Sequence, residues 1–235
     1  MKVKILGTRG EIKPSSPYHS RHSGVLINNE LLVDLGEKEF LKYSPRWVII
    51  SHLHPDHAYF VRKKENSSKL DIKAQIYAPE RYGNIDLTIL EPEQLLKINS
   101  YKIRTIPTIH SKTVETFAYT VKHKDSKILY TGDLVWLEKK YHHYLTDLNL
   151  VIMEASFLQE GGFVQRDEEN TLWGHTGIPN LIRLFSDFTD KMLILHFGSW
   201  FYELGAKEAR KELKKLGKKD GVRILVGYDG QVLEV

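Results

Sequence analysis

The most informative stretch of this 235-residue sequence is Ser51-His52-Leu53-His54-Pro55-Asp56-His57. It follows the apolar run 47–50 directly and places four potential metal ligands within six positions. Imidazole and carboxylate groups together suit zinc and its first-row neighbours. If the apolar run is a strand, side chains two apart share a face, so His52 and His54 point the same way. Pro55 ends the strand, and the bend can bring Asp56 and His57 to the same point. The spacing therefore indicates two adjacent metal positions.

The alternative is a polar loop in which histidines cluster by chance. A single pair of histidines would fit that interpretation. Four ligand-type side chains in one short block fit it poorly, although any motif carries a risk of false matches. We therefore expect a metal site here.

The composition predicts one domain covering residues 1–235 with a substantial core, since 41% of the residues are hydrophobic. The absence of cysteine excludes disulfides, thiolate metal sites and cysteine nucleophiles. With 34 basic and 30 acidic residues, the net charge of +4 is no nucleic-acid signature by itself. No window is apolar enough for a membrane span, and the first residues do not form a signal peptide. We therefore expect a cytoplasmic protein that does not enter a membrane.

Short apolar runs alternate with turns and amphipathic segments along the chain. They predict strands at 3–6, 24–27, 31–34, 47–51, 74–77, 102–106, 117–121, 127–130, 150–153, 192–195 and 223–226. Helices are predicted at 37–42, 57–64, 176–186 and 202–216, with Pro179 in the opening turn of the third. This order indicates an α+β fold in which helices cover layered sheets.

Three further ligand-type side chains each follow a separate predicted strand. His110 lies in the loop after 102–106, Asp133 follows 127–130 with Gly132 before it, and His196 ends 192–195. Active sites are usually assembled where strands end on one edge of a sheet. Each residue alone would more often be a cap or a loop residue. Together with the block at 51–57 they form a plausible ligand set.

In these residues and their order, the whole chain resembles the metallo-β-lactamase superfamily of binuclear metallohydrolases. The first motif of that family is an aspartate after a strand, matched here by Asp34. The block from His52 to His57 matches the second motif. The remaining motifs look like His110, Asp133 and His196.

The resemblance implies a four-layer αββα sandwich and two divalent metal ions. One ion would be held by His52, His54 and His110, and the other by Asp56, His57 and His196. Asp133 would bridge the two ions, and Asp34 would orient a metal-binding histidine. Zinc is the expected metal, because imidazole ligands dominate, while manganese or iron would also fit.

A second cluster is Trp173-Gly174-His175-Thr176, just before a predicted helix. One interpretation is a helix start with Thr176 as its cap and His175 exposed. Against it, Glu154 ends a strongly apolar predicted strand, where a carboxylate is costly unless it is paired or catalytic. Both segments look like those of the phosphodiesterase branch of the family, which includes tRNA 3′-processing endonuclease (RNase Z) and phosphoribosyl cyclic phosphodiesterase. By that likeness, Glu154 would orient His175, and His175 would protonate the leaving oxygen or stabilise the phosphoryl charge.

Two more stretches fit the same branch, namely 6–10 and 226–230. RNase Z also carries a tRNA-binding arm between its third and fourth motifs. In this chain a short predicted hairpin fills the segment between His110 and Asp133, so long tRNA is not an expected partner. The phosphoribosyl enzyme has extra cysteines that this chain lacks, which leaves the substrate open.

Several other side chains have two interpretations. Lys112 could contact a substrate phosphate or be an exposed loop lysine. Trp200, Phe201 and Tyr202 could line the pocket, where they would stack on a base, or anchor the last helix. The histidines without an evident partner in the sequence are interpreted as surface residues: His19, His123, His142 and His143.

The function that fits best is a binuclear metal-dependent phosphodiesterase acting on a small cyclic or nucleotide-derived phosphodiester. Two metals would activate a bridging hydroxide, and Asp56, His175 and Glu154 would take part in catalysis. A hydrolase of a lactone, thioester or lactam is the first alternative. A metal-dependent binding module without activity is the second, because fold alone does not fix function. A homodimer is possible, since dimers are common among relatives of this fold.

Overall fold

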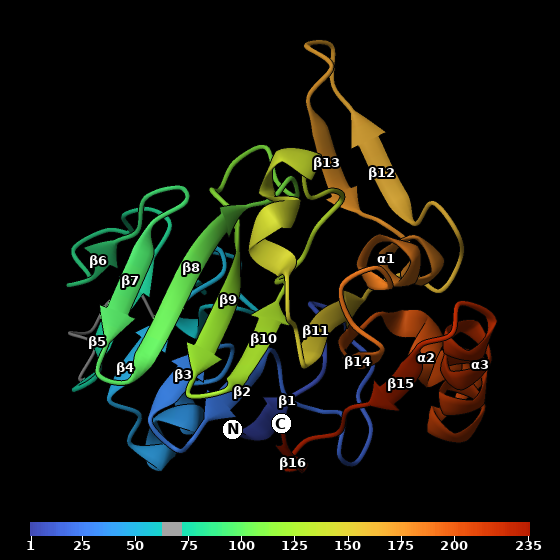
Figure 1. The fold of residues 1–235 in the computed structure, drawn as a ribbon, viewed down its shortest axis with the longest axis horizontal. Coiled ribbons are helices and arrows are strands. Elements are labelled where there is room, and N and C mark those ends of the chain that lie inside the picture. Colours follow the sequence, from blue (N-terminus) through green and yellow to red (C-terminus); the bar gives the residue numbers. More distant parts are fainter. Residues whose placement is uncertain (63–71) are drawn as a thin grey trace.

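The computed structural model of the chain describes residues 1–62 and 72–235. Within these residues the strands form two seven-stranded sheets and a separate two-stranded sheet (Figure 1). The first sheet has the order β16-β1-β2-β3-β4-β5-β6. Its strands are β1 (Lys2–Gly7), β2 (Gly24–Ile27), β3 (Leu31–Val33), β4 (Trp47–Ile49), β5 (Gln75–Ala78), β6 (Thr88–Ile89) and β16 (Val232–Glu234).

The second large sheet has the order β15-β14-β11-β10-β9-β8-β7. Its strands are β7 (Leu95–Ile98), β8 (Tyr101–Pro107), β9 (Phe117–His123), β10 (Ser126–Tyr130), β11 (Leu150–Ala155), β14 (Lys191–Phe197) and β15 (Arg223–Val226). The two-stranded sheet pairs β12 (Phe163–Arg166) with β13 (Leu172–His175). In Figure 1 this hairpin projects from the body of the molecule.

Alternation along the strands explains why the two large sheets stack. In β3, Leu31 and Val33 join a core built from both sheets, while Leu32 faces the opposite side. In β11, Leu150 and Ile152 join the same central core, while Val151 and Met153 face outward. Because the strands are apolar on both faces, each sheet needs a second cover on its outer side.

The outer covers are helical on both sides. The second sheet packs against α1 (Ile178–Phe185), α2 (Ser199–Leu204), α3 (Ala206–Lys219) and η3 (Lys139–Leu145). The first sheet is covered by the short 3₁₀ helices η1 (Lys38–Tyr43) and η2 (Tyr59–Val61). The predicted α+β class and four-layer αββα sandwich are therefore confirmed. None of the helices in the described ranges combines the length and apolar character that a membrane crossing requires.

All the predicted strands are present, but three of the four predicted helices differ. Residues 57–59 do not start an α-helix, because their backbone pairs with Leu35: its N–H donates to His57, and its carbonyl accepts from Tyr59. The last two positions of the predicted helix 57–64 lie outside the described residues. Gly205, with φ of +77°, divides the predicted helix 202–216 into α2 and α3. Segment 37–42 is 3₁₀ rather than α-helical.

The stretches 6–10 and 226–230 meet in space, although they lie at opposite ends of the chain. Thr8 donates to the Asp229 carboxylate over 2.8 Å. The other carboxylate oxygen of Asp229 accepts the backbone N–H groups of Ser20, at 2.9 Å, and Arg21, at 3.1 Å. The Asp229 side chain therefore ties the loop after β1 to the end of the chain.

The interpretation of His19 as a surface residue is wrong, because only 1% of this residue is exposed. Its Nδ1 lies 3.1 Å from the Thr8 hydroxyl, and its Nε2 lies 3.2 Å from an Arg210 guanidinium nitrogen. The rings of Phe197 and Phe201 pack on its imidazole. Burial, with a contribution from the Arg210 charge, lowers the pKa of His19 to about 4. Since Arg210 donates to Nε2, the folded protein holds this imidazole neutral.

We expect His19 to make the fold sensitive to acid. Unfolded histidine has a pKa of about 6.5, so the unfolded chain takes up this proton first as the pH falls. The stability that neutral His19 contributes is present above pH 6.5 and is lost as the pH falls toward about 4. Urea unfolding of the wild type and His19→Gln across this range should show the wild type losing more stability. Parallel pH profiles for the two proteins would contradict the assignment.

Candidate metal centre

Polar side chains from both large sheets meet at one edge of the sandwich, where strands end. The first sheet contributes residues that follow β3 and β4, and the second contributes residues after β8 and β10 and near the ends of β11 and β14. These residues are Asp34, His52, His54, Asp56, His57, His110, Asp133, Glu154 and His196. All of them except His54 are buried. The structure thus brings the seven predicted metal ligands together.

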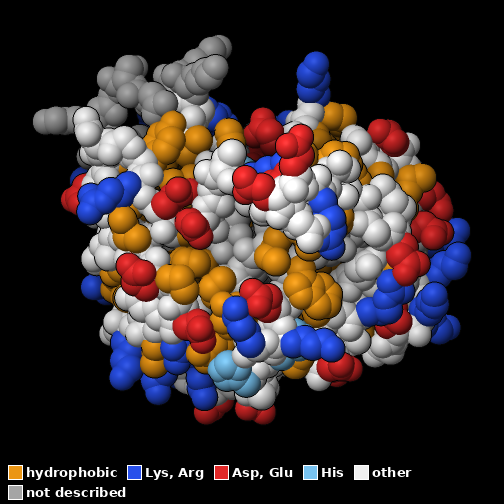
Figure 2. Space-filling model, turned by 90° about the horizontal axis from the view of Figure 1, so that it is seen from above, with side chains coloured by type: hydrophobic (Ala, Val, Ile, Leu, Met, Phe, Trp, Pro, Cys, Tyr) orange, Lys and Arg blue, Asp and Glu red, His pale blue; other side chains and the backbone are white. Residues whose placement is uncertain are grey.

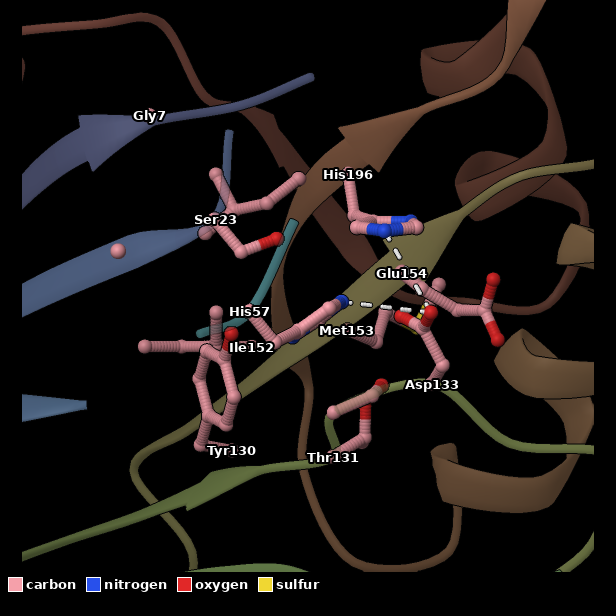
Figure 3. A pocket seen from close by; sticks show the side chains of 13 residues that line it. Gly7, Ser23, His57, Tyr130, Thr131, Asp133, Ile152, Met153, Glu154 and His196 are labelled. Atoms are coloured by element: carbon pink, nitrogen blue, oxygen red, sulfur yellow. Dashed lines mark hydrogen bonds and ion pairs between the residues drawn. The ribbon is translucent and has the colours of Figure 1, made fainter. Parts of the chain in front are cut away.

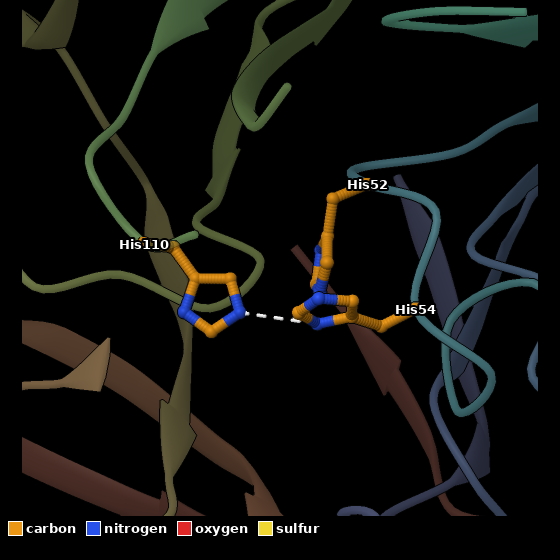
Figure 4. Close-up of side chains that lie close together, drawn as sticks. All are labelled: His52, His54 and His110. Atoms are coloured by element: carbon orange, nitrogen blue, oxygen red, sulfur yellow. Dashed lines mark hydrogen bonds between the residues drawn. The ribbon is translucent and has the colours of Figure 1, made fainter. Parts of the chain in front are cut away.

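The first group of ligand atoms comes from three histidines, shown in Figure 4. The ligand atoms of His52, His54 and His110 lie within 4.8 Å of one another. Nδ1 of His110 donates to the carbonyl of Gly174 at 2.7 Å, so its Nε2 keeps a free lone pair. That Nε2 lies 3.3 Å from Nδ1 of His54. The three rings therefore point nitrogen atoms toward a common point.

The second group contains two carboxylates and two histidines, namely Asp56, His57, Asp133 and His196. Nε2 of His196 lies 2.8 Å from an Asp56 carboxylate oxygen. It also lies 3.4 Å from an Asp133 oxygen, a contact that is drawn in Figure 3. Nε2 of His57 lies 3.3 Å from the same Asp133 oxygen. This oxygen is also 3.8 Å from Nε2 of His52 and 3.9 Å from Nε2 of His110. Asp133 therefore lies between the two groups.

Unpartnered atoms within this cluster fit a cation. Nε2 of His52, Nε2 of His57 and Oδ1 of Asp133 are buried and make no hydrogen bond. Such atoms are costly in a protein interior unless a partner satisfies them. Histidine nitrogen and carboxylate oxygen are the donors that zinc and other first-row divalent metals take. The cluster is therefore consistent with a binuclear metal site.

The protonation of the three-histidine group suits metal ligands. Burial, together with neighbouring imidazoles, lowers the pKa of His52 well below its usual range and that of His54 to about 4. Neutral imidazole is the metal-binding form. Burial alone would also lower the pKa of His57 and of His196, but the Asp133 and Asp56 carboxylates raise both. In this second group, the histidines and aspartates lie at ion-pair distance from one another.

The fully buried carboxylate of Asp34 accepts hydrogen bonds from several residues beneath the ligand cluster. It accepts the backbone N–H of Ser51 at 2.6 Å and the hydroxyl of Ser51 at 2.9 Å. It also accepts Nδ1–H of His57 at 2.7 Å and the hydroxyl of Tyr130 at 2.6 Å. These bonds fix the His57 ring so that Nε2 faces Asp133. Asp34 therefore occupies the position of the orienting residue that the resemblance implies.

An irregularity in the second sheet places two site residues. Met153 pairs with Ile194 and Ala155 pairs with Phe197, so the single residue Glu154 opposes two residues of β14. One of these is His196, whose φ of +53° lies in the left-handed region. A bulge of this kind redirects side chains, and it leaves both Glu154 and His196 at the site.

His175, at the end of β13, pairs with Glu154. Its Nδ1 lies 2.8 Å from Oε2 of Glu154, whose Oε1 accepts the backbone N–H of Leu134 at 2.8 Å. Nδ1 of His175 is also 3.9 Å from Asp133. Burial alone would lower the pKa of His175, but Glu154 and then Asp133 raise it to about 9. The side chain of His175 is 22% exposed, whereas that of Glu154 is 1% exposed, so His175 is the member of the pair that solvent reaches.

The remaining candidate side chains, Lys112 and the aromatic residues 200–202, contact other protein groups. Nζ of Lys112 lies 3.4 Å from the Asp167 carboxylate and 4.9 Å above the Trp173 ring. The Trp200 indole donates to the carbonyl of Ala155, and the Tyr202 hydroxyl donates to the carbonyl of His19. Phe201 is fully buried. These three aromatic residues therefore anchor α2.

Some site residues carry no signal in the sequence, because only a backbone group or a distant contact gives them a role. The Gly174 carbonyl orients His110, and a side chain at Gly10 would meet the His196 ring at 3.0 Å. Tyr130 ends an apolar strand, and nothing near it in the sequence indicates its hydrogen bond to Asp34. Its role follows only from the folded arrangement.

We expect Asp34→Asn to weaken metal binding about 10–100-fold, as is typical when a partner that orients a ligand is lost. An amide has only one acceptor oxygen, so it cannot accept all the hydrogen bonds that converge on Asp34. Its NH₂ group would place a second donor opposite Nδ1–H of His57. Competition with a chromogenic chelator measures the zinc affinity. Tyr130→Phe, which removes one donor, should give a smaller loss, and Asp125→Asn on the exposed β9–β10 turn serves as the control. Equal affinity for Asp34→Asn and the control would contradict this role.

Residues 42–197 match the family model described as "Beta-lactamase superfamily domain". No curated protein matches the chain. The structure is similar to the metallo-β-lactamase fold protein YhfI from Bacillus subtilis, with a TM-score of 0.71, 20% identity, and coverage of 100% of this chain and 98% of that one. Human tRNase Z, short form, gives a TM-score of 0.63, 16% identity, and coverage of 100% and 99%.

A diphosphatase from the PhnP family gives a TM-score of 0.66 and 14% identity, with coverage of 100% of this chain and 97% of that chain. At such identities the structural likeness concerns the fold alone. The family model, in contrast, spans more than half of the sequence and includes the ligands from His52 to His196. The chain therefore belongs to the beta-lactamase superfamily of metal-dependent hydrolases.

Proposed function

We propose that this protein is a binuclear metal-dependent phosphodiesterase that acts on a small cyclic or nucleotide-derived phosphodiester. The observation that carries the proposal is the pair His175 and Glu154, placed beside Asp133. Two of the similar structures are described as a diphosphatase from the PhnP family and as human tRNase Z, which supports phosphate chemistry.

The pair suits a reaction with a poor leaving group. A phosphodiester that releases an alkoxide needs a proton at the departing oxygen, and a positioned general acid contributes about 10²–10⁴-fold in rate. Glu154 uses one oxygen on the backbone N–H of Leu134 and the other on Nδ1 of His175. It therefore fixes the ring and favours its protonated form. The second ring nitrogen of His175 is then the proton donor.

The residues grouped around Asp133 would hold two divalent metals, for which we propose zinc. When bound, such ions stabilise the phosphoryl charge and activate the attacking water. Asp56 and His196, paired at 2.8 Å, would bind the metal farther from the three-histidine group. Asp56 would thereby take part in catalysis.

The size of the proposed substrate follows from the segment between His110 and Asp133. The antiparallel pair β9 and β10, part of the second sheet, occupies most of it. This segment therefore has no long extension that could hold an RNA. We propose a small substrate and expect no specific binding of long tRNA.

The role of His175 predicts an effect that depends on the leaving group. His175→Ala should lower kcat about 10²–10⁴-fold on a phosphodiester with an alkoxide leaving group. On bis-p-nitrophenyl phosphate the loss should be much smaller, because p-nitrophenolate departs without protonation. The zinc content of the variant should stay unchanged, since His175 is not one of the proposed ligands. The exposed residue His143 provides the control variant His143→Ala.

The reaction class is tested with the zinc- and manganese-loaded wild type. We expect chelator-sensitive release from bis-p-nitrophenyl phosphate, and none from a p-nitrophenyl ester or a chromogenic lactam. Release only from the ester or the lactam would overturn the phosphodiesterase proposal. An equal loss on both phosphodiesters in His175→Ala would show that the residue does not act as a general acid.

A further inference from the structure

The hairpin β12–β13 is attached to the site at its base. Gly174 and the metal-ligand candidate His110 exchange two hydrogen bonds of 2.7 Å: the Gly174 N–H donates to the His110 carbonyl, and Nδ1 of His110 donates to the Gly174 carbonyl. A two-stranded hairpin alone is marginally stable in water. The hydrogen bonds of Gly174, which also orients His110, hold the base of the hairpin. The rest of the hairpin projects from the body of the molecule (Figure 1).

Strand register places aromatic side chains on the face of the hairpin that carries His175. Phe163 pairs with His175, and Gln165 pairs with Trp173. Residues directly opposite on antiparallel strands share a face, and residues two apart on one strand do so too. These four side chains therefore lie on one face. Val164, next to Phe163 in β12, lies on the other face.

The rings on this face run outward from His175. Phe157 lies 5.9 Å from the His175 ring and stacks on Phe163, with centroids 6.0 Å apart and an interplanar angle of 21°. Phe163 in turn meets Trp173 edge-on at 5.9 Å. Lys112 covers the Trp173 ring. Phe163 remains 44% exposed, so it is the accessible ring of the series.

We infer that the His175 face of the β12–β13 hairpin is a leaving-group subsite that takes a planar aromatic group, with Phe163 as its stacking platform. The inference rests on the proposed function, because it assumes that the leaving oxygen lies at His175. An aromatic or nucleoside leaving group bonded to that oxygen would extend along the rings. The Gln165 amide would then face the edge of a base, and the Lys112 ammonium would face an anionic substituent.

The main competing occupant is a second copy of the chain. Homodimer interfaces are more apolar than the rest of the protein surface, and large exposed apolar patches mark such contacts. The exposed apolar residues of β12, Phe163 and Val164, point to opposite faces of the hairpin, and the Phe163 face carries Gln165 and the Lys112–Asp167 ion pair. Figure 2, which looks down on the end from which the hairpin projects, shows hydrophobic and charged side chains interspersed. One accessible ring among polar groups fits a small planar ligand better than a subunit.

The test compares ligands that differ only in the aromatic group. Isothermal titration of the zinc-loaded protein measures adenosine 5′-monophosphate against ribose 5-phosphate, and phenyl phosphate against methyl phosphate. Stacking on an aromatic side chain should favour the aromatic member of each pair about 5- to 150-fold. The preference should disappear in Phe163→Ala and persist in Phe163→Tyr, which keeps a ring. Val164→Ala, on the other face of the same strand, should retain it.

The outcomes separate the sources of the aromatic group and the competing explanations. A preference in both pairs shows that a simple aryl group suffices, and one confined to the adenosine pair shows that a base is needed; both support the inference. Equal binding within both pairs, or equal losses in Phe163→Ala and Val164→Ala, overturns it. So does a dimer in sedimentation that Phe163→Ala converts to monomer. Turnover of bis-p-nitrophenyl phosphate by the wild type tests the proposed function separately.

Discussion

The burial of carboxylates where two apolar sheets end together is the constraint on which the rest of the structure depends. Asp34, Asp56, Asp133 and Glu154 are each 3% exposed or less. A buried carboxylate is tolerated only when charges or hydrogen bonds satisfy it. The meeting strand ends supply these partners, from the Ser51 N–H to the imidazoles. The composition of the site therefore follows from the need to satisfy these buried carboxylates.

The buried carboxylates differ in how completely hydrogen bonds satisfy them. Asp34 has four donors, and both oxygens of Glu154 are bonded. Asp133 has ion-pair neighbours but one oxygen without a hydrogen bond, and Nε2 of His52 is equally unpartnered. A preorganised cation site is expected to hold ligand atoms without hydrogen-bond partners among rigidly fixed side chains. Asp133 therefore belongs to the buried ion pairs of the site and also offers a free oxygen to a metal.

Much of this could be predicted from the sequence, because buried strands and ligand spacing leave local signals. The apolar strands were recognisable since both of their faces are covered, and the six-residue block was recognisable from its spacing. The segment after Asp56 is not predictable from its own sequence, because pairing with Leu35, a distant residue, overrides local helix preference. The burial of His19 depends on Arg210, far along the chain, and so leaves no local signal. The exposed β12–β13 hairpin lacks a hydrophobic pattern of its own.

The inner centre and the hairpin have different physical roles. The centre is built on the ends of packed strands, where small movements are resisted, as chemistry with metals requires. The hairpin projects from the sandwich, and it is attached through Gly174 at its base and through Lys112, which contacts Asp167 and Trp173. Variable segments on a rigid scaffold commonly carry specificity. The two parts are joined through His175, which ends β13 and contacts Glu154 of β11.

The most direct test of the metal centre is an anomalous difference map from crystals grown with zinc, recorded at the zinc absorption edge. Two peaks are predicted, one coordinated by His52, His54 and His110 and the other by Asp56, His57 and His196. Asp133 should contact both peaks. A single peak, or zinc bound only at exposed histidines such as His143, would contradict a binuclear centre at the edge of the sandwich.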